Sequence, residues 1–180
     1  MSHLKTTFIS LFAGPGAGKS TTAAAVFSRL KTLGYDAELV PEFAKELVWE
    51  ERQRTLANQS YVTARQFYSI KRLEGQCQFV ITDSPVFLGT AYVTADYPQS
   101  YLDTVKWWHD QTFTEGYGFF LDRGGRKFSD NGRVHSHLES RMLDERIITM
   151  MRDSGIRATT LRQSEAVEII VKKVCTDYPL

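Results

Sequence analysis

Cysteine is scarce in this sequence of 180 residues, which contains only Cys77 and Cys175. The two have neither the density of a disulfide scaffold nor the spacing of a CxxC motif, so we expect reduced residues that serve packing. The chain also lacks an excess of charge of one sign, since 22 lysines and arginines are balanced by 21 aspartates and glutamates, which leaves a net charge of +1. Tight binding to bulk nucleic acid requires a clearly basic surface, so this balance leaves room for a local basic patch at most.

Long hydrophobic runs are missing as well. No apolar run approaches the roughly 18 residues that indicate a membrane span, and the first residues lack the hydrophobic core of a signal peptide. We therefore expect a cytoplasmic protein without membrane contact. With 42% hydrophobic and 24% charged residues, the composition is that of an ordinary globular protein, which excludes disorder, collagen and coiled coil. A chain of this length is expected to form a single domain, residues 1–180.

Short apolar runs rich in strand-forming residues alternate with segments of helical periodicity. The predicted strands cover residues 6–13, 37–40, 78–82, 118–121 and 156–161. The predicted helices include residues 61–74, residues 100–113 behind a cap formed by Ser100 and Asp103, and residues 136–151. This alternation predicts an α/β fold whose parallel sheet is covered by helices on both faces and binds its ligands at the carboxyl ends of the strands.

The first predicted strand runs into the segment AGPGAGKS at residues 13–20, which fits the P-loop pattern with Ala13 in place of its first glycine. Glycines allow the positive φ angles that turn backbone N–H groups into an anion cradle. Lys19 is expected, as an exposed loop residue, to reach the β- and γ-phosphates of ATP, and the Ser20 hydroxyl to bind Mg²⁺. A glycine-rich turn that only packs a helix against a strand is the alternative, but the strand–turn–helix context favours the P-loop. The predicted nucleotide-binding residues are Gly14, Pro15, Gly16, Ala17, Gly18, Lys19, Ser20 and Thr21.

On this motif the chain resembles the P-loop NTPase superfamily and, within it, the nucleoside and nucleotide kinase branch. It looks most like the AAA-type small-molecule kinases that include the ribosylnicotinamide kinase domain. Three further patterns occur in the order that this group shows: Glu42 after the second strand, Asp83 at the end of the third, and a glycine- and arginine-containing flap before a helix. The resemblance implies a three-layer fold with a five-stranded sheet of order 2-3-1-4-5, and ATP and Mg²⁺ as cofactors.

Asp83 directly follows the apolar run of the third predicted strand, where a Walker B carboxylate lies beside a P-loop. An acid at this place can hold the Mg²⁺ shell or accept the proton of the acceptor hydroxyl. The alternative is an Asp-Ser-Pro turn without a function, since these residue types favour turns. We favour the functional reading, with Asp83 and Ser20 as the metal-binding pair.

Glu42 lies just past the second predicted strand, on the same rim of the sheet. The resemblance to nucleoside kinases implies that a glutamate here contacts or deprotonates the acceptor hydroxyl. The alternative is a glutamate in the first turn of a helix, which the helix dipole stabilises without any catalytic role.

The flap, approximately residues 122–134, carries a local net charge of +2 from four cations and two aspartates. We expect a basic lid hinged by its glycines, because phosphoryl transfer requires cations near the developing charge and the family's lids supply arginines. A solvated basic loop is the competing reading. The predicted catalytic residues are Lys19, Glu42, Asp83, Arg126 and Arg133.

The segment His135-x-His137-x-Glu139 has the residue types of a metal site. We expect no metal there, because Ser136 and Glu139 form a capping box for the helix that follows and so already engage the glutamate. Aromatic residues make up 12% of the chain, and several of them, Tyr92 among them, lie in segments that should wall the acceptor pocket. A planar base stacks well on such rings, although core packing explains any single one better.

These features favour a kinase that moves the γ-phosphate of ATP to a small nucleoside- or nucleotide-like acceptor. A kinase acting on a hydroxyl within DNA is an alternative that only the basic flap supports, so a nucleic-acid partner is not favoured. A regulatory ATPase that is not a kinase is the other alternative. A switch GTPase is excluded, because no Asn-Lys-x-Asp guanine motif occurs.

Overall fold

The computed structural model describes residues 4–113, 116–124 and 137–180. Five parallel strands form one sheet of order β2-β3-β1-β4-β5, which confirms the predicted fold class and strand order. The strands are β1 (Thr7–Phe12), β2 (Ala37–Val40), β3 (Phe79–Thr82), β4 (Tyr117–Asp122) and β5 (Thr159–Arg162). The helices are α1 (Lys19–Thr32), α2 (Phe43–Trp49), α3 (Gln53–Ala57), α4 (Gln59–Lys71), the 3-10 helix η1 (Val86–Tyr92), α5 (Gln99–Phe113), α6 (His137–Asp153) and α7 (Ala166–Asp177).

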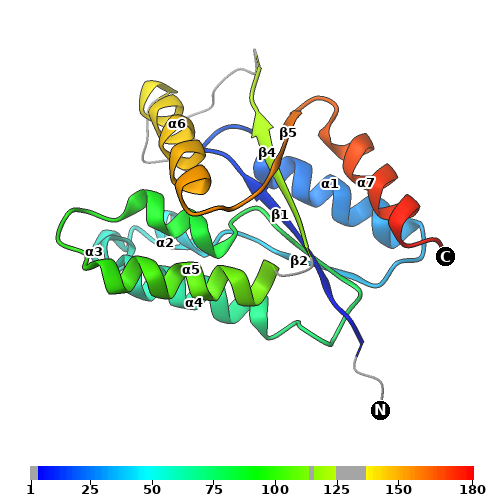
Figure 1. Cartoon of the computed structure of the whole chain (residues 1–180), viewed down its shortest axis with the longest axis horizontal. Helices are drawn as coiled ribbons and strands as arrows, with labels where there is room; N and C mark the ends of the chain where they lie inside the picture. Colours follow the sequence, from blue (N-terminus) through cyan, green and yellow to red (C-terminus); the bar gives the residue numbers. More distant parts are fainter. Residues whose placement is uncertain (1–3, 114–115, 125–136) are drawn as a thin grey trace.

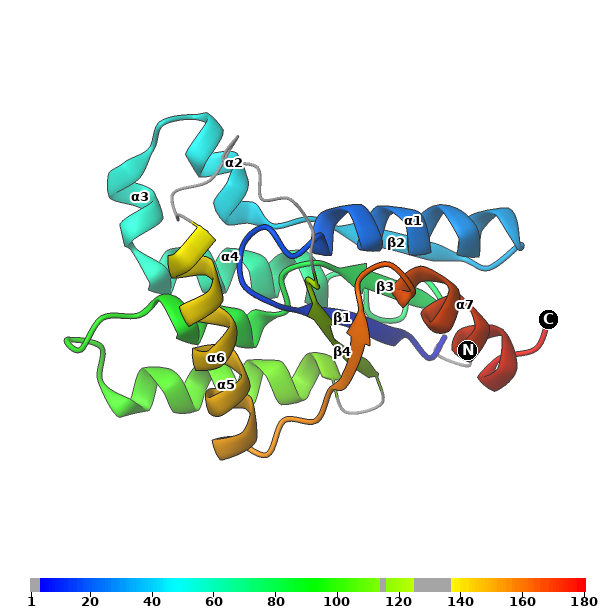
Figure 2. The ribbon, with the colours of Figure 1, turned by 90° about the horizontal axis from the view of Figure 1, so that it is seen from above.

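The sheet is the middle of three layers. Helices α1 and α7 cover one face, α4 and α5 cover the other, and α6 lies near the carboxyl ends of the strands (Figures 1 and 2). All six residues of the central strand β1 are buried, whereas the edge strand β5 buries Leu161 alone. This difference arises because helices cover both faces of the sheet at its centre. None of the described helices is both long and apolar enough to cross a bilayer.

One capping prediction differs from the structure, and two short elements were not predicted. Helix α5 begins at Gln99, so Ser100 lies inside the helix and its carbonyl accepts a hydrogen bond from Thr104 Oγ1 at 2.8 Å. The Ser100–Asp103 capping prediction was therefore wrong by two residues, since the residue that precedes the helix is Pro98. The elements α3 and η1 were not predicted, because runs of five and seven residues are too short to show a clear helical period. Ser136, the predicted cap of α6, lies outside the described residues.

His109 of α5 is buried beneath the end of β1, with 2% of its surface exposed. Its ring lies against Phe12, Phe87 and Phe113, with ring centroids 6.1, 5.8 and 4.8 Å away. Burial lowers the pKa of His109 to about 4, and its Nε2 has no hydrogen-bond partner among the described residues. The histidine is therefore neutral in the folded chain at neutral pH.

We expect this histidine to make stability depend on pH. Its pKa rises from about 4 in the folded chain to an ordinary 6.5 on unfolding, so the unfolded chain binds more protons between these values. The stability contribution is complete above pH 6.5 and falls as the pH approaches 4, with a loss of about 2 kcal/mol already at pH 5. Urea denaturation at pH 7.5 and pH 5 measures this loss, and His109→Phe should remove most of it. An equal loss in the variant would show that other groups cause the pH dependence.

Candidate functional site

The P-loop connects β1 to α1 at the carboxyl edge of the sheet. Gly16 and Gly18 adopt φ angles of 82° and 94°, which L residues with a side chain rarely reach. Gly18 is the N-cap of α1, and its carbonyl accepts the first helical hydrogen bond, from Thr22 N at 2.9 Å. The glycines of the motif therefore produce the turn that places the start of α1 beside the end of β1.

Lys19, the first residue of α1, is folded back over the loop. Its Nζ donates to the carbonyl oxygens of Ala13 and Gly14 at 2.7 and 3.1 Å, and only 9% of the residue is exposed. Burial lowers the pKa of Lys19, while the nearby carboxylate of Glu42 acts in the opposite direction. The prediction of an exposed lysine was wrong, because the Lys19 side chain folds back from the start of α1 and is enclosed by the P-loop.

Asp83 lies next to the P-loop at the end of β3. Its Oδ2 accepts a hydrogen bond from Ser20 Oγ, and 3% of the residue is exposed. Its Oδ1 is buried and has no hydrogen-bond partner within the described part of the chain. The structure thus joins Ser20 and Asp83, the two residues that the sequence predicts as metal ligands.

Glu42 is the N-cap residue of α2, in an extended conformation, and its side chain makes no capping hydrogen bond. The residue lines the same cavity as Lys19 and Ser20. The helix-dipole reading placed this glutamate inside the first turn of a helix, whereas the structure places it before that turn and beside the cavity.

This cavity has a volume of about 460 Å³, within the roughly 300–1,000 Å³ of ligand pockets in proteins. The P-loop contributes Pro15, Gly16, Gly18, Lys19, Ser20 and Thr21 to its wall. The rest of the wall comes from α2, α3, α4 and η1 and from Glu42, Ser84 and Pro85, which lie just before α2 and η1. The cavity therefore extends from the P-loop into the helical region on one side of the sheet, where an acceptor can lie next to a phosphate.

Two wall features were not predicted from the sequence. Gln66 of α4 is 4% exposed; its Oε1 accepts from Phe43 N at 3.0 Å and its Nε2 donates to the Pro41 carbonyl at 3.3 Å. These bonds tie the segment that carries Glu42 to α4. At Gly89 of η1, a Cβ atom would lie 2.4 Å from Thr63 Oγ1, so glycine allows η1 to pack closely on α4.

Of the aromatic residues considered for the acceptor pocket, Tyr92 lines the cavity. Burial raises the pKa of Tyr92, and the neighbouring carboxylate of Glu42 raises it further, so the phenol is protonated at neutral pH. Phe87 belongs to the core instead, and Phe67 stacks on Trp108 with ring centroids 5.1 Å apart.

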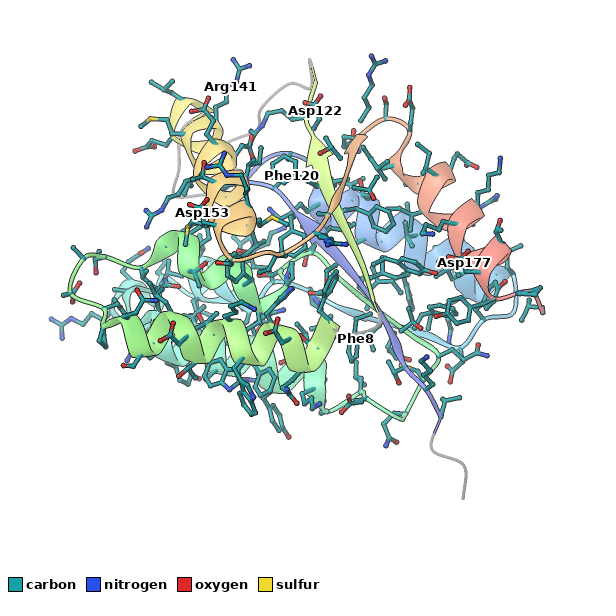
Figure 3. All side chains as sticks on the ribbon, in the orientation of Figure 1. Phe8, Phe120, Asp122, Arg141, Asp153 and Asp177 are labelled. Atoms are coloured by element: carbon teal, nitrogen blue, oxygen red, sulfur yellow. The ribbon has the colours of Figure 1, made fainter. Side chains whose placement is uncertain are left out.

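In the described part of the flap, one cationic side chain, that of Arg123, contacts the P-loop. Arg123 follows β4, is 8% exposed, and donates from Nη1 to the Pro15 carbonyl at 3.1 Å and from Nη2 to the Ser140 carbonyl at 3.1 Å. Its Nη2 also lies 2.5 Å from Asp144 Oδ2, and that carboxylate accepts from Gly14 N through Oδ1 at 2.6 Å. Figure 3 labels the neighbouring residues Asp122 and Arg141 at this end of the molecule, opposite Phe8.

Two predicted lid residues, Arg126 and Arg133, lie outside the described residues, as do Ser136 and His135 of the segment considered for a metal. Within residues 4–113, 116–124 and 137–180, no three His, Cys, Asp or Glu side chains are grouped so that they could hold a metal ion.

The profile of a protein family described as an AAA domain matches residues 8–168. The chain belongs to this family. No curated protein matches this AAA domain in sequence. Among solved structures, deoxyadenosine kinase from M. mycoides, with the products dCMP and a flexible dCDP bound, matches with a TM-score of 0.54 and 17% identity over 94% of this chain and 100% of that chain. The fold of this AAA domain is therefore that of P-loop nucleoside kinases, as the resemblance implied.

Proposed function

We propose that this AAA domain is a kinase that transfers the γ-phosphate of ATP to a hydroxyl group of a nucleoside- or nucleotide-like acceptor. One observation carries the proposal: the P-loop cation Lys19 and the carboxylate Glu42 lie on the wall of one cavity. The cavity also extends beyond the P-loop to α4 and η1, which leaves room for a second substrate. A purely regulatory ATPase needs no acceptor pocket.

The residues divide the reaction between them. Lys19 stabilises the negative charge that develops on the β- and γ-phosphates. Glu42 accepts the proton of the acceptor hydroxyl while the hydroxyl oxygen forms its bond to the γ-phosphorus. The bond between this phosphorus and the β–γ bridging oxygen breaks, and ADP leaves.

The side chains present fit a magnesium ion. Asp83 Oδ1 is a buried carboxylate oxygen without a partner among the described residues, and Ser20 Oγ lies beside Oδ2 of the same carboxylate. Hard oxygen ligands of this kind are those that Mg²⁺ prefers. When bound, the ion neutralises charge on the phosphates. Asp83 and Ser20 are the residues that would hold it.

Phosphate transfer from labelled ATP to a panel of nucleosides, mononucleotides and single-stranded DNA ends tests the proposal, with water as control acceptor. We expect transfer to at least one small acceptor at a rate well above ATP hydrolysis. Transfer to DNA alone would instead support the alternative of a hydroxyl within DNA. Hydrolysis without transfer to any acceptor would support a regulatory ATPase and contradict the proposal.

Asp83→Asn is expected to lower kcat about 100-fold, because it keeps the shape of the side chain but removes the charge that the metal requires. The rate of the variant should also require more Mg²⁺ for half-saturation. Steady-state rates over a series of Mg²⁺ concentrations measure both effects. Asp96→Asn removes a carboxylate from an exposed residue and serves as the control. An unchanged rate and metal response in Asp83→Asn would support the reading of Asp83 as a turn former.

A further inference from the structure

Arg123 and Asp144 connect helix α6 and the end of β4 to the first turn of the P-loop. Both partners are well covered, since their side chains are 7% and 17% exposed. Besides the 2.5 Å contact through Nη2, Arg123 Nε donates to Asp144 Oδ2 at 2.8 Å. A guanidinium that meets one carboxylate through two nitrogens is held in a fixed orientation.

The P-loop backbone fits closely beneath this ion pair. At Gly14, a Cβ atom would lie 2.5 Å from the Ser140 carbonyl oxygen and 2.9 Å from Asp144 Oδ1. Glycine is thus required by the close approach of α6.

The peptide between Ala13 and Gly14 is held from both sides. Its N–H donates to Asp144 Oδ1 at 2.6 Å, and its carbonyl oxygen accepts from Lys19 Nζ at 2.7 Å. In a trans peptide the N–H and the C=O point in opposite directions, so these two bonds fix the rotation of the peptide plane. Because Asp144 and Lys19 bind the same peptide group, these bonds also fix the position of Lys19 relative to Asp144.

The peptide between Pro15 and Gly16 is fixed from one side. Its carbonyl oxygen accepts from Arg123 Nη1 at 3.1 Å, so the Gly16 N–H must point away from Arg123. Pro15 has no N–H and a restricted φ, so its carbonyl is the backbone group through which Arg123 can orient this turn. Gly16 lines the cavity, where its N–H can serve the anion cradle.

We propose that Arg123 and Asp144 are positioning residues for the nucleotide: together they orient the Ala13–Gly14 and Pro15–Gly16 peptides so that Lys19 and the Gly16 N–H meet the phosphates of ATP. This inference rests on the proposed function only in that the P-loop binds a nucleotide. It does not depend on the acceptor. It assigns a function to Asp144, which no local sequence motif indicates.

The test measures the affinity for ADP by calorimetry, without any acceptor, in Asp144→Asn, Arg123→Lys and Arg123→Gln. Each variant is expected to bind ADP about 10- to 100-fold more weakly, because a hydrogen bond to a charged group is lost. Glu145→Gln is the matched control, since Glu145 is the exposed neighbour of Asp144 on α6 and should leave the affinity unchanged. If Arg123→Lys binds ADP like the wild type, charge alone suffices and the orienting role is overturned.

A double-variant cycle shows whether the two residues act together. Asp144→Asn combined with Arg123→Gln should bind ADP more weakly than either single variant but by less than the two losses combined, because both changes break the shared ion pair while each also removes its own bond to the loop. Additive losses would show separate roles and overturn the proposal.

A spectroscopic signature separates positioning from a general loss of structure. The Gly14 amide proton, bonded to a carboxylate, should lie downfield in the NMR spectrum and move upfield in Asp144→Asn but not in Glu145→Gln. An unchanged Gly14 resonance in Asp144→Asn would contradict the inference even if Arg123→Gln failed to fold. If these variants bind ADP more weakly while the wild-type chain transfers phosphate to no acceptor, the positioning role is supported and the kinase proposal is contradicted. The two proposals can therefore fail separately.

Discussion

Lys19→Met is expected to abolish phosphoryl transfer, with a loss in kcat of about 10³-fold or more, while the chain stays folded. The ammonium group supplies a preorganised positive charge in a water-poor site, where removing one such group is costly. Methionine keeps the apolar stem of the side chain, which suits a residue that is only 9% exposed. Burial lowers the pKa of Lys19 by more than the nearby carboxylates, Glu42 first among them, raise it, so the folded chain disfavours the charged form and loss of the charge should not unfold the chain.

Transfer rates at saturating ATP and the thermal unfolding midpoint measure the two parts of this prediction. Lys31→Met provides the control, because Lys31 lies at the other end of α1 with its side chain 45% exposed. The control should keep the wild-type rate. If Lys19→Met retained a rate within tenfold of the wild type, the assignment of the P-loop as the phosphate site would be wrong.

The strands and the P-loop could be predicted from the sequence because both depend on local signals. The buried strand β1 is a continuous apolar run, and the loop after it has a fixed spacing between glycines, lysine and serine. The contact between Ser20 and Asp83 follows from parallel topology, since β1 and β3 are neighbours and end at the same edge. The order of the five strands came from the resemblance.

The parts that were not predicted depend on contacts between distant residues. Gly14 and Asp144 are 130 positions apart, and nothing near Asp144 distinguishes it from the other acids of α6. Gln66 likewise resembles any polar residue of an amphipathic helix until its two bonds to the segment before α2 are seen. The burial of Lys19 depends on the fold of the loop rather than on hydropathy. The roles of Arg126 and Arg133, the single-domain organisation and the cytoplasmic location stay predictions.

Glu42→Gln is expected to separate the two kinds of acceptor. A hydroxyl has a high pKa and gains about 10²- to 10⁴-fold from a nearby base, whereas a phosphate oxygen is already ionised and needs none. For a nucleoside-like alcohol, the variant should therefore lose kcat by this factor while its affinity for ADP stays nearly constant. The matched control is Glu46→Gln, an exposed glutamate in the first turn of the same helix, which should keep the wild-type kcat.

Asp83 could partly replace Glu42 as the base, since it also lies beside the P-loop. The double variant with Asp83→Asn therefore decides the case. If the acceptor is a monophosphate, Glu42→Gln should change KM for the acceptor and leave kcat intact, because the base is not used. If both the single and the double variant transferred phosphate to every acceptor at the wild-type rate, a hydroxyl kinase that uses Glu42 as its base would be excluded. The cavity between the P-loop and α4 would then need a different explanation.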